Sequence, residues 1–371
     1  MSDDLPPEPD RVDGAPHPRE TAQLLGHDHA EAAFLSAYGA GRLHHAWMIT
    51  GARGIGKATL AWRIARFLVA TPPEEGLFGG VPDALALPQD HPVWRRSLSL
   101  SEPAIALCRR AWDDKAKRLK TALTVDEVRR LKQHFSLSAP DGGWRVALID
   151  AVDEMNNAAA NALLKLLEEP PAQTVLLLIC HQPARLLPTI RSRCRTLRLN
   201  QLGLDDFGTA LAQAGQEVED IRLLHSLTGG SVGDAIRLLN LGGLDVVESI
   251  TALLSDGGAI DRHRLASLAA RGAGRQNATT YTMIVELTLL LLARMARAGA
   301  GADLAGDAVA SALRDRLCPT PDAAWIWAET QQQLTERTTH AAAVNLDPEQ
   351  VILDMFLTID KTAARVQHDL R

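Results

Sequence analysis

The nine residues GARGIGKAT, from Gly51 to Thr59, constrain the fold of this chain more than any other stretch. An apolar segment, HHAWMIT, precedes them, and KATLAWRIARFLVA follows with apolar residues on one helical face. A strand, a glycine-rich turn and a helix in this order form a phosphate-binding loop, or P-loop, whose backbone N–H groups meet phosphate oxygens at the helix N-terminus. Gly51, Gly54, Gly56 and Lys57 supply the glycines and the lysine of such a loop. We therefore expect a nucleotide-binding architecture.

Groups that a P-loop needs for hydrolysis are replaced in this chain. Ala58 stands where a hydroxyl would hold Mg²⁺, and Thr59 carries its hydroxyl one position late, about 100° further round the helix. The segment RVALID ends in Asp150, placed as the Walker B aspartate that helps to hold Mg²⁺. Ala151 follows, where hydrolysing members of this class commonly carry a water-orienting glutamate. We expect no hydrolysis here, and we expect Thr59 to be a poor metal ligand that can still touch a phosphate.

Strand and helix patterns alternate before residue 200. RVALID is followed by the helical pattern NNAAANALLKLLEE, which two prolines end, and then by the apolar strand TVLLLIC. This alternation predicts an α/β fold, a parallel sheet with helices on both faces. From about Leu202 strand signals fade, and the remainder is predicted to be helical. The predicted domains are a disordered, proline-rich acidic tail at 1–20, a P-loop domain at 21–200, a small helical domain at 201–245 and a larger helical domain at 246–371.

Composition excludes several classes of protein. A net charge of −6 and a pI near 6.1 argue against a protein that coats DNA by bulk electrostatics. The four cysteines form no C-x-x-C pair, so neither a disulfide framework nor a zinc ribbon is expected, and a reducing cytoplasm fits. No signal-peptide pattern opens the chain. The most apolar run, IVELTLLLLARM, is too short for a bilayer and contains Glu286 and Arg294, so we expect a buried helix.

Three separated motifs resemble those of one family. HHAWMITGARGIGKATLA, ANALLKLLEEPP and LLPTIRSRC, in this order, are similar to the clamp-loader branch of the AAA+ proteins, and within it to the delta-prime subunits of bacterial DNA polymerase III. The resemblance is strong over about residues 20–200 and weaker beyond. NLDPEQVILDMFL is similar to the collar helices through which such subunits form a ring. The resemblance implies an AAA+ module followed by a lid domain at 201–245 and a collar domain at 246–371.

The resemblance also assigns a role to Arg193. Ser192, Arg193 and Cys194 match the family's Ser-Arg-Cys motif, whose arginine reaches into the ATP site of the neighbouring subunit as an arginine finger. A guanidinium suits that task because it is always charged and offers a planar fork of donors to phosphoryl oxygens. The alternative is an arginine that solvates a helix end, because neighbouring arginines at 191, 195 and 198 make a chance match easy.

Further departures from the family concern sensing residues and zinc. In GGSVGDAIRLL, Gly233 stands where active relatives carry a phosphate-sensing arginine. Cys180 and His181 end the third strand, where relatives often have a polar sensor, and we expect His181 at the surface. Many delta-prime subunits hold zinc with a cysteine cluster after the P-loop helix, but only Cys108 lies near, so we predict no zinc. No cofactor is expected to be required, although the intact glycines are compatible with weak binding of ATP or ADP at the degenerate P-loop.

The expected partners follow from the resemblance. They are an ATPase subunit and a delta-like subunit in a hetero-oligomeric ring, with the sliding clamp and primer-template DNA contacted through the assembly, and no membrane. The basic run CRRAWDDKAKRLK offers a DNA-binding surface, but its two aspartates favour a solvated face. The basic residues of this run are Arg109, Arg110, Lys115, Lys117, Arg118 and Lys120.

Three functions remain open from the sequence. The one we favour is a cytoplasmic clamp-loader subunit that does not hydrolyse ATP itself and donates Arg193 to a neighbour. The second is an ATP-hydrolysing clamp-loader subunit in which Thr59 and Asp153 compensate for the lost groups, although Asp153 and Glu154 are better explained as charges that favour a helix start. The third is an interaction-only scaffold that needs neither Lys57 nor Arg193.

Overall fold

The computed structural model describes residues 7–71, 83–136, 143–255, 260–302 and 307–369. It divides the chain into two compact units. The first comprises residues 1–217 and 230–236, and the second comprises residues 218–229 and 237–371. The domain boundaries expected at residues 200 and 245 stay a prediction, since the segment between them contributes to both units.

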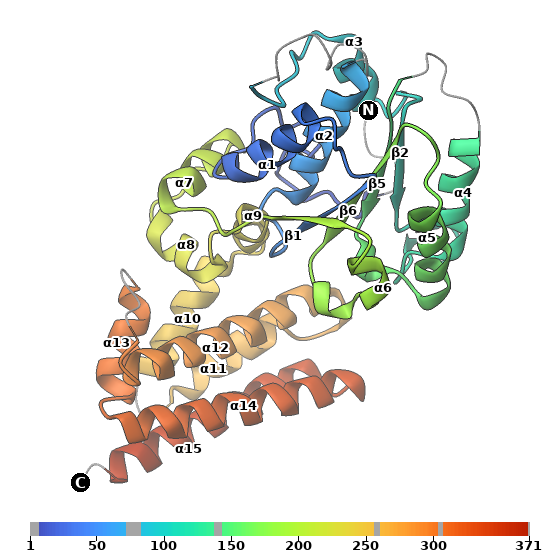
Figure 1. Cartoon of the computed structure of the whole chain (residues 1–371). Coiled ribbons are helices and arrows are strands. Elements are labelled where there is room, and N and C mark those ends of the chain that lie inside the picture. The colour runs from blue at the N-terminus through green and yellow to red at the C-terminus, as the bar shows by residue number, and fades with distance from the viewer. Residues whose placement is uncertain (1–6, 72–82, 137–142, 256–259, 303–306, 370–371) are drawn as a thin grey trace. The chain divides into compact units, whose positions relative to one another are not determined.

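The first unit is built on a five-stranded parallel sheet with the order β2-β5-β6-β1-β7 (Figure 1). Such an arrangement brings the carboxyl ends of all strands to one edge, where ligands bind in α/β proteins. The predicted α/β class is confirmed. The strands are β1 (Ala46–Thr50), β2 (Ile105–Arg109), β5 (Arg145–Asp150), β6 (Thr174–Cys180) and β7 (Arg195–Arg198), and a separate hairpin pairs β3 (Trp112–Asp113) with β4 (Arg118–Leu119).

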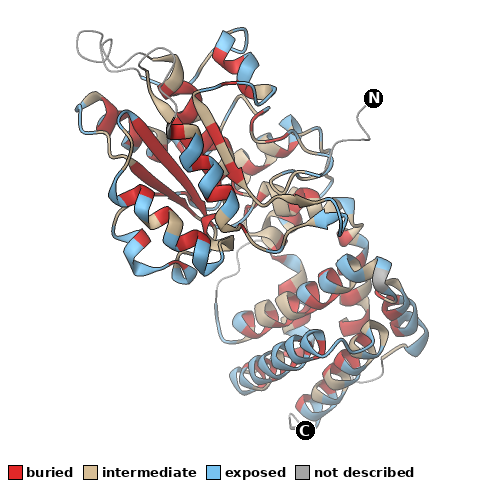
Figure 2. Cartoon of the chain, turned by 90° about the vertical axis from the view of Figure 1, so that its right-hand side faces the viewer, coloured by how far each residue is buried: buried red, intermediate tan, exposed pale blue. Residues whose placement is uncertain are grey.

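Two helical layers cover the sheet. Side chains of alternate strand residues, such as Trp47 and Leu177, pack with α1 and α2 on one face, while their neighbours Met48 and Leu178 pack with α4 and α5 on the other. Figure 2 shows buried residues along the strands and on the inner faces of these helices. The helices of this unit are α1 (Asp28–Gly39), α2 (Lys57–Ala70), α3 (Pro92–Leu98), α4 (Val125–Ser136), α5 (Asn157–Glu168), α6 (Pro188–Arg191), α7 (Leu204–Gln213) and the first half of α9 (Val232–Asn240).

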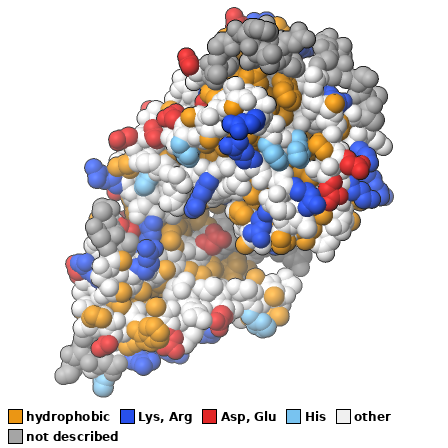
Figure 3. All heavy atoms as spheres, in the orientation of Figure 1, with side chains coloured by type: hydrophobic (Ala, Val, Ile, Leu, Met, Phe, Trp, Pro, Cys, Tyr) orange, Lys and Arg blue, Asp and Glu red, His pale blue; other side chains and the backbone are white. Residues whose placement is uncertain are grey.

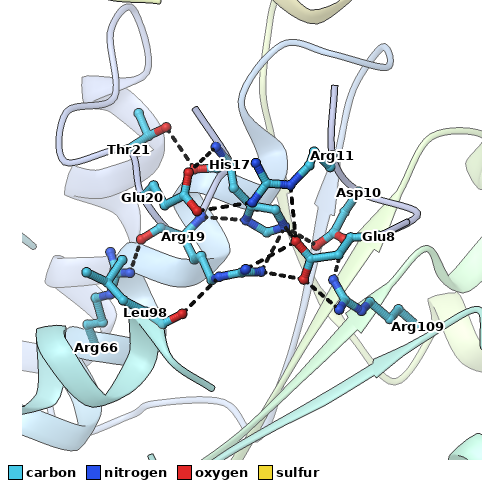
Figure 4. Close-up of polar contacts among 10 residues, drawn as sticks. All are labelled: Glu8, Asp10, Arg11, His17, Arg19, Glu20, Thr21, Arg66, Leu98 and Arg109. Atoms are coloured by element: carbon cyan, nitrogen blue, oxygen red, sulfur yellow. Dashed lines mark hydrogen bonds and ion pairs between the residues drawn. The ribbon is translucent and has the colours of Figure 1, made fainter. Parts of the chain in front are cut away.

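Residues 7–20 pack against the α/β unit, which corrects the expectation of a disordered tail for this part of the chain. Figure 4 shows their polar network. Arg109, at the end of β2, donates to Glu8 at 2.8 Å and to Asp10 at 2.6 Å. His17 is fully buried, with its Nε2 3.2 Å from Asp10. The acidic residues that suggested disorder therefore have cationic partners far away in the sequence, which composition cannot show. We call residues 7–20 the N-terminal strap.

A second arginine secures the strap to the helical layer. Arg19 donates from Nη1 to Glu8 at 2.7 Å and from Nε to the carbonyl of Leu98 at 3.1 Å. The carbonyl of Arg19 in turn accepts from Arg66 of α2, whose guanidinium stacks 3.7 Å from the centre of the Trp94 ring. Arg66 is fully buried, and burial lowers its pKa to about 10.

The second unit consists of helices around one apolar core. Its described residues contain no strand, as the fading strand signals predicted. Its helices are α8 (Ile221–Thr228), the second half of α9, α10 (Gly243–Ser255), α11 (Arg262–Arg271), α12 (Ala278–Gly299), α13 (Ala308–Leu317), α14 (Pro321–Ala343) and α15 (Pro348–Asp369).

Helix α12 contains the most apolar run of the sequence and lies in that core. By length and composition alone it could span a membrane. Leu291, Leu292 and Met295 are nevertheless fully buried among the other helices of the unit. Its Arg294 forms a 2.9 Å ion pair with Asp307, whose side chain also caps α13. The predicted buried helix is confirmed.

Candidate functional site

The P-loop connects β1 to α2, as the sequence predicts. Gly51, Gly54 and Gly56 all have positive φ angles, of 148°, 73° and 100°, which glycine adopts without strain. Lys57 begins α2, and only 3% of its surface is exposed. Its ammonium donates to the carbonyl oxygen of Gly51 at 2.9 Å and to that of Ala52. The lysine that would contact phosphate is thus bonded to its own loop.

Asp150 ends β5 beside this loop. Burial raises its pKa to about 7, and the carboxylates of Asp10 and Glu154 add to the effect, while Lys57 opposes it. Burial likewise lowers the pKa of Lys57 to about 8, against the attraction of Asp150. Ala151 is buried, and Thr59, also buried, lies in the first turn of α2. The structure therefore brings the predicted loop, lysine and aspartate together.

The two acids after Asp150 each have a specific partner. Asp153 accepts from the backbone N–H of His181 at 2.9 Å and from that of Gln182 at 3.1 Å, so it ties the end of β5 to the end of β6. Glu154 lies 2.7 Å from Arg53 in the P-loop and 2.6 Å from Arg110. Both residues lie in a 3-10 turn (Val152–Glu154) ahead of α5. Their positions are therefore explained by these specific contacts rather than by attraction to the dipole of α5.

The segment around Ser231 closes over the P-loop within the first unit. The Ser231 hydroxyl donates to the carbonyl of Arg53 at 2.8 Å. The N–H of Gly233 donates to the carbonyl of Gly54 at 2.9 Å. A Cβ built on Gly233 would lie 2.8 Å from the Cα of Gly54, closer than real side chains come. Sequence comparison with the family flagged Gly233 as a lost arginine, but only the structure shows the backbone contact that a side chain there would break.

Arg193 lies on the surface after α6, and 37% of its side chain is exposed. Its Nη1 donates to the carbonyl of Thr189 at 3.1 Å, and its Nη2 lies 2.9 Å from the carboxylate of Glu168, the last residue of α5. Ser192 donates to the same Thr189 carbonyl at 3.2 Å, and Cys194 is half-buried against the core. Glu168 was not singled out from the sequence, although it is part of the ANALLKLLEEPP motif.

The basic run does not form one continuous cationic surface. Arg109 is bonded to the strap, Arg110 to Glu154, and Lys120 lies 3.4 Å from Glu127. The exposed remainder, Lys115 and residues 117–118, lies on or beside the β3–β4 hairpin. On the face drawn in Figure 3, Lys and Arg side chains are scattered among acidic and apolar ones. This distribution fits the expected solvated face.

Within the described ranges, no three His, Cys, Asp or Glu side chains form a group that could hold a metal ion. The absence of zinc stays a prediction. The thiol of Cys108 is buried, which raises its pKa to about 12, so it is poorly suited to act as a thiolate ligand.

Together, the parallel sheet, the P-loop and the lysine at the start of α2 define a P-loop α/β module of the AAA+ class. The family model described as "DNA polymerase III, delta subunit" matches residues 26–203. The delta-prime subunit of DNA polymerase III from Pseudomonas aeruginosa is 37% identical over 57% of this chain, and the gamma subunit from Buchnera aphidicola is 29% identical over 60%. Residues 26–203 thus belong to the clamp-loader family of DNA polymerase III subunits.

These matches cover only part of each relative. They span 61% of the Pseudomonas delta-prime subunit and 58% of the Buchnera gamma subunit. The delta-prime subunit of Escherichia coli is 34% identical over 43% of this chain and 44% of its own length. Among solved structures, a DNA polymerase III gamma subunit-related protein from Thermotoga maritima covers 89% of this chain at 13% identity, with a TM-score of 0.41.

Proposed function

We propose that this chain is a delta-prime-like subunit of a bacterial clamp loader that does not hydrolyse ATP and donates Arg193 to the ATP site of a neighbouring subunit. The observation that supports the lack of hydrolysis is that Lys57 is hydrogen-bonded to its own loop. Its ammonium is held by the carbonyls of Gly51 and Ala52, so a phosphate must displace these bonds before it can use the lysine. Ala58 and Ala151 leave neither a hydroxyl for Mg²⁺ nor a carboxylate for water.

The contact between Gly233 and Gly54 also supports the lack of hydrolysis. A nucleotide in a P-loop lies against the N–H groups of the loop, and here Ser231 and Gly233, bonded to the carbonyls of Arg53 and Gly54, already lie directly on the loop. Any ATP or ADP would therefore bind weakly, and no cofactor is required for the proposed role. In this role the subunit acts in trans, through Arg193 at the ATP site of its neighbour.

The exposure of Arg193 supports its donation to a neighbour. An arginine finger must reach a phosphate on another subunit, so it has to lie at the surface with donors to spare. In this structure Nη1 donates one hydrogen bond and Nη2 forms an ion pair, which leaves other N–H donors of the guanidinium for a phosphate. The proposed partners are an ATPase subunit and a delta-like subunit in a cytoplasmic ring, with the sliding clamp and primer-template DNA bound by the assembly.

The test is ATP hydrolysis by reconstituted complexes, stimulated by DNA and clamp. Arg193→Ala should abolish turnover at one site, because arginine fingers contribute on the order of 10³–10⁵ in rate, while the complex still assembles. Arg193→Lys should resemble Arg193→Ala, since it keeps the charge but loses the planar fork. Lys57→Ala should leave hydrolysis nearly unchanged.

The second candidate is a subunit that hydrolyses ATP at its own P-loop, which the retained glycines, Lys57 and Asp150 favour. It predicts the opposite result in the same assay. Lys57→Ala would then be the damaging change and Arg193→Ala would be silent, and that outcome would replace the proposed function.

A further inference from the structure

The guanidinium of Arg193 is held between two helices. Nη2 lies 2.9 Å from Oε1 of Glu168, and Nη1 donates at 3.1 Å to the carbonyl of Thr189. Glu168 is the last residue of α5 and Thr189 belongs to α6, and these helices pack side by side (Figure 1). Two rigid elements therefore fix the direction in which the guanidinium points.

The position of Glu168 is electrostatically unfavourable without a cation. The C-terminal end of a helix carries a partial negative charge, so a carboxylate there is repelled. Glu169 adds a second negative charge next to it. The ion pair with Arg193 offsets this cost, and the two prolines after Glu169 prevent the helix from extending past it. The negative charges around Glu168 thus favour its ion pair with Arg193 over a solvated carboxylate.

We infer that Glu168 is a positioning residue for Arg193. This inference rests on the proposed function. A long arginine side chain loses rotamer freedom when it is fixed. The ion pair with Glu168 and the hydrogen bond to Thr189 fix part of the side chain before the neighbour's ATP arrives, and the other N–H groups stay available to phosphoryl oxygens.

The expected size of the effect is modest. Both side chains are partly exposed, 37% for Arg193 and 49% for Glu168, and exposed pairs contribute little in water. Loss of the pair should therefore lower the Arg193-dependent hydrolysis about two- to fivefold rather than abolish it. If the carboxylate instead masked the finger from phosphate, its removal would raise the rate.

The experiment compares Glu168→Gln and Glu168→Lys in the reconstituted complex. The measured quantity is the DNA- and clamp-stimulated hydrolysis that Arg193→Ala removes. We expect kcat for this fraction to fall in the order wild type, Glu168→Gln, Glu168→Lys, with KM for ATP and complex assembly unchanged. Glu169→Gln and Glu169→Lys are matched controls, because Glu169 is exposed, adjacent, and forms no ion pair with another described residue.

A double substitution separates positioning from a general effect on folding. In the Arg193→Ala background, Glu168→Gln should change nothing, because a residue that acts only through Arg193 has no further effect once Arg193 is gone. A further loss there, a rise in kcat, or equal effects of the Glu168 and Glu169 variants would overturn the positioning role. Silence of Arg193→Ala itself would instead overturn the proposed function, and the positioning role with it.

Discussion

Gly233 and Gly54 are in backbone contact, with the N–H of Gly233 donating to the carbonyl of Gly54 at 2.9 Å. A Cβ on Gly54 would meet the Ser231 hydroxyl at 2.4 Å, and a Cβ on Gly233 would meet Gly54 at 2.8 Å. The close approach of the two segments therefore requires glycine at both positions. The resemblance predicts a missing arginine at position 233, and the contact explains why a side chain there is incompatible with this closed loop.

The first prediction concerns the return of that arginine. Gly233→Arg should lower the free energy of unfolding by about 1–3 kcal/mol, since overpacking costs that much and the clash is with backbone. It should not create an ATPase, because Ala58 and Ala151 are unchanged. Urea unfolding and steady-state hydrolysis of the purified subunit check both points. Unchanged stability would contradict the closed contact.

The second prediction concerns nucleotide binding by the isolated subunit. Lys57 must leave the Gly51 and Ala52 carbonyls before it meets a phosphate, so we expect weak binding of MgATP, with a Kd on the order of 1 mM or higher. At 1 mM such a ligand adds less than about 0.5 kcal/mol to stability, and the melting temperature should barely move. The Ser231→Ala variant lacks the hydrogen bond to the Arg53 carbonyl, so it should bind MgATP more tightly than the wild type does. A large thermal shift in the wild type would refute the inward bonding of Lys57.

Periodicity predicted the elements of the P-loop module well. The strands ending at Thr50, Asp150 and Cys180 consist of buried residues or nearly so, and such continuous apolar runs are typical of parallel strands covered on both faces. Strands β2 and β7 were not predicted. In β7 three of the four residues are exposed arginines or threonine, and its burial rests on Leu197 alone. An edge strand with one apolar residue carries too little pattern to be recognised.

The site was predictable where it depends on local sequence and unpredictable where it depends on contact. Lys57 and Asp150 were found from motif and position. The partners of Arg193 and Arg109 were not, because Glu168 and Glu8 are far from them in the sequence. The strap illustrates the general difficulty, since composition describes a segment alone and its order comes from residues elsewhere in the chain.

The third prediction tests the strap through Arg109. Arg109→Gln leaves the side chain of Asp10, only 5% exposed, with His17 as its remaining partner, and breaking a buried pair costs about 3 kcal/mol. Arg118→Gln, on the exposed β3–β4 hairpin, is the matched control and should cost little. Adding Asp10→Asn to Arg109→Gln should recover part of the loss, because the stranded charge is removed. Equal stabilities of the two single variants in urea would show that the strap contributes nothing.

The last prediction concerns the pH dependence that Asp150 imposes. Burial raises the pKa of Asp150 from its usual 3.8 to about 7, so between these values the folded protein holds a proton that the unfolded chain has released. Stability contributed by that proton is lost as the pH rises through the window. Asp150→Asn removes the titration, and its gain over the wild type should grow with pH, by at most about 3 kcal/mol between pH 5 and pH 8, since one pKa unit corresponds to about 1.4 kcal/mol. Lys57 reduces the gain, because in the variant it loses its nearby counter-charge. Urea unfolding of both proteins across this range measures the difference, with the exposed Asp114→Asn as the control for one lost negative charge. A gain that stays constant or shrinks as the pH rises would mean that Asp150 is ionised throughout and remains available to a metal ion.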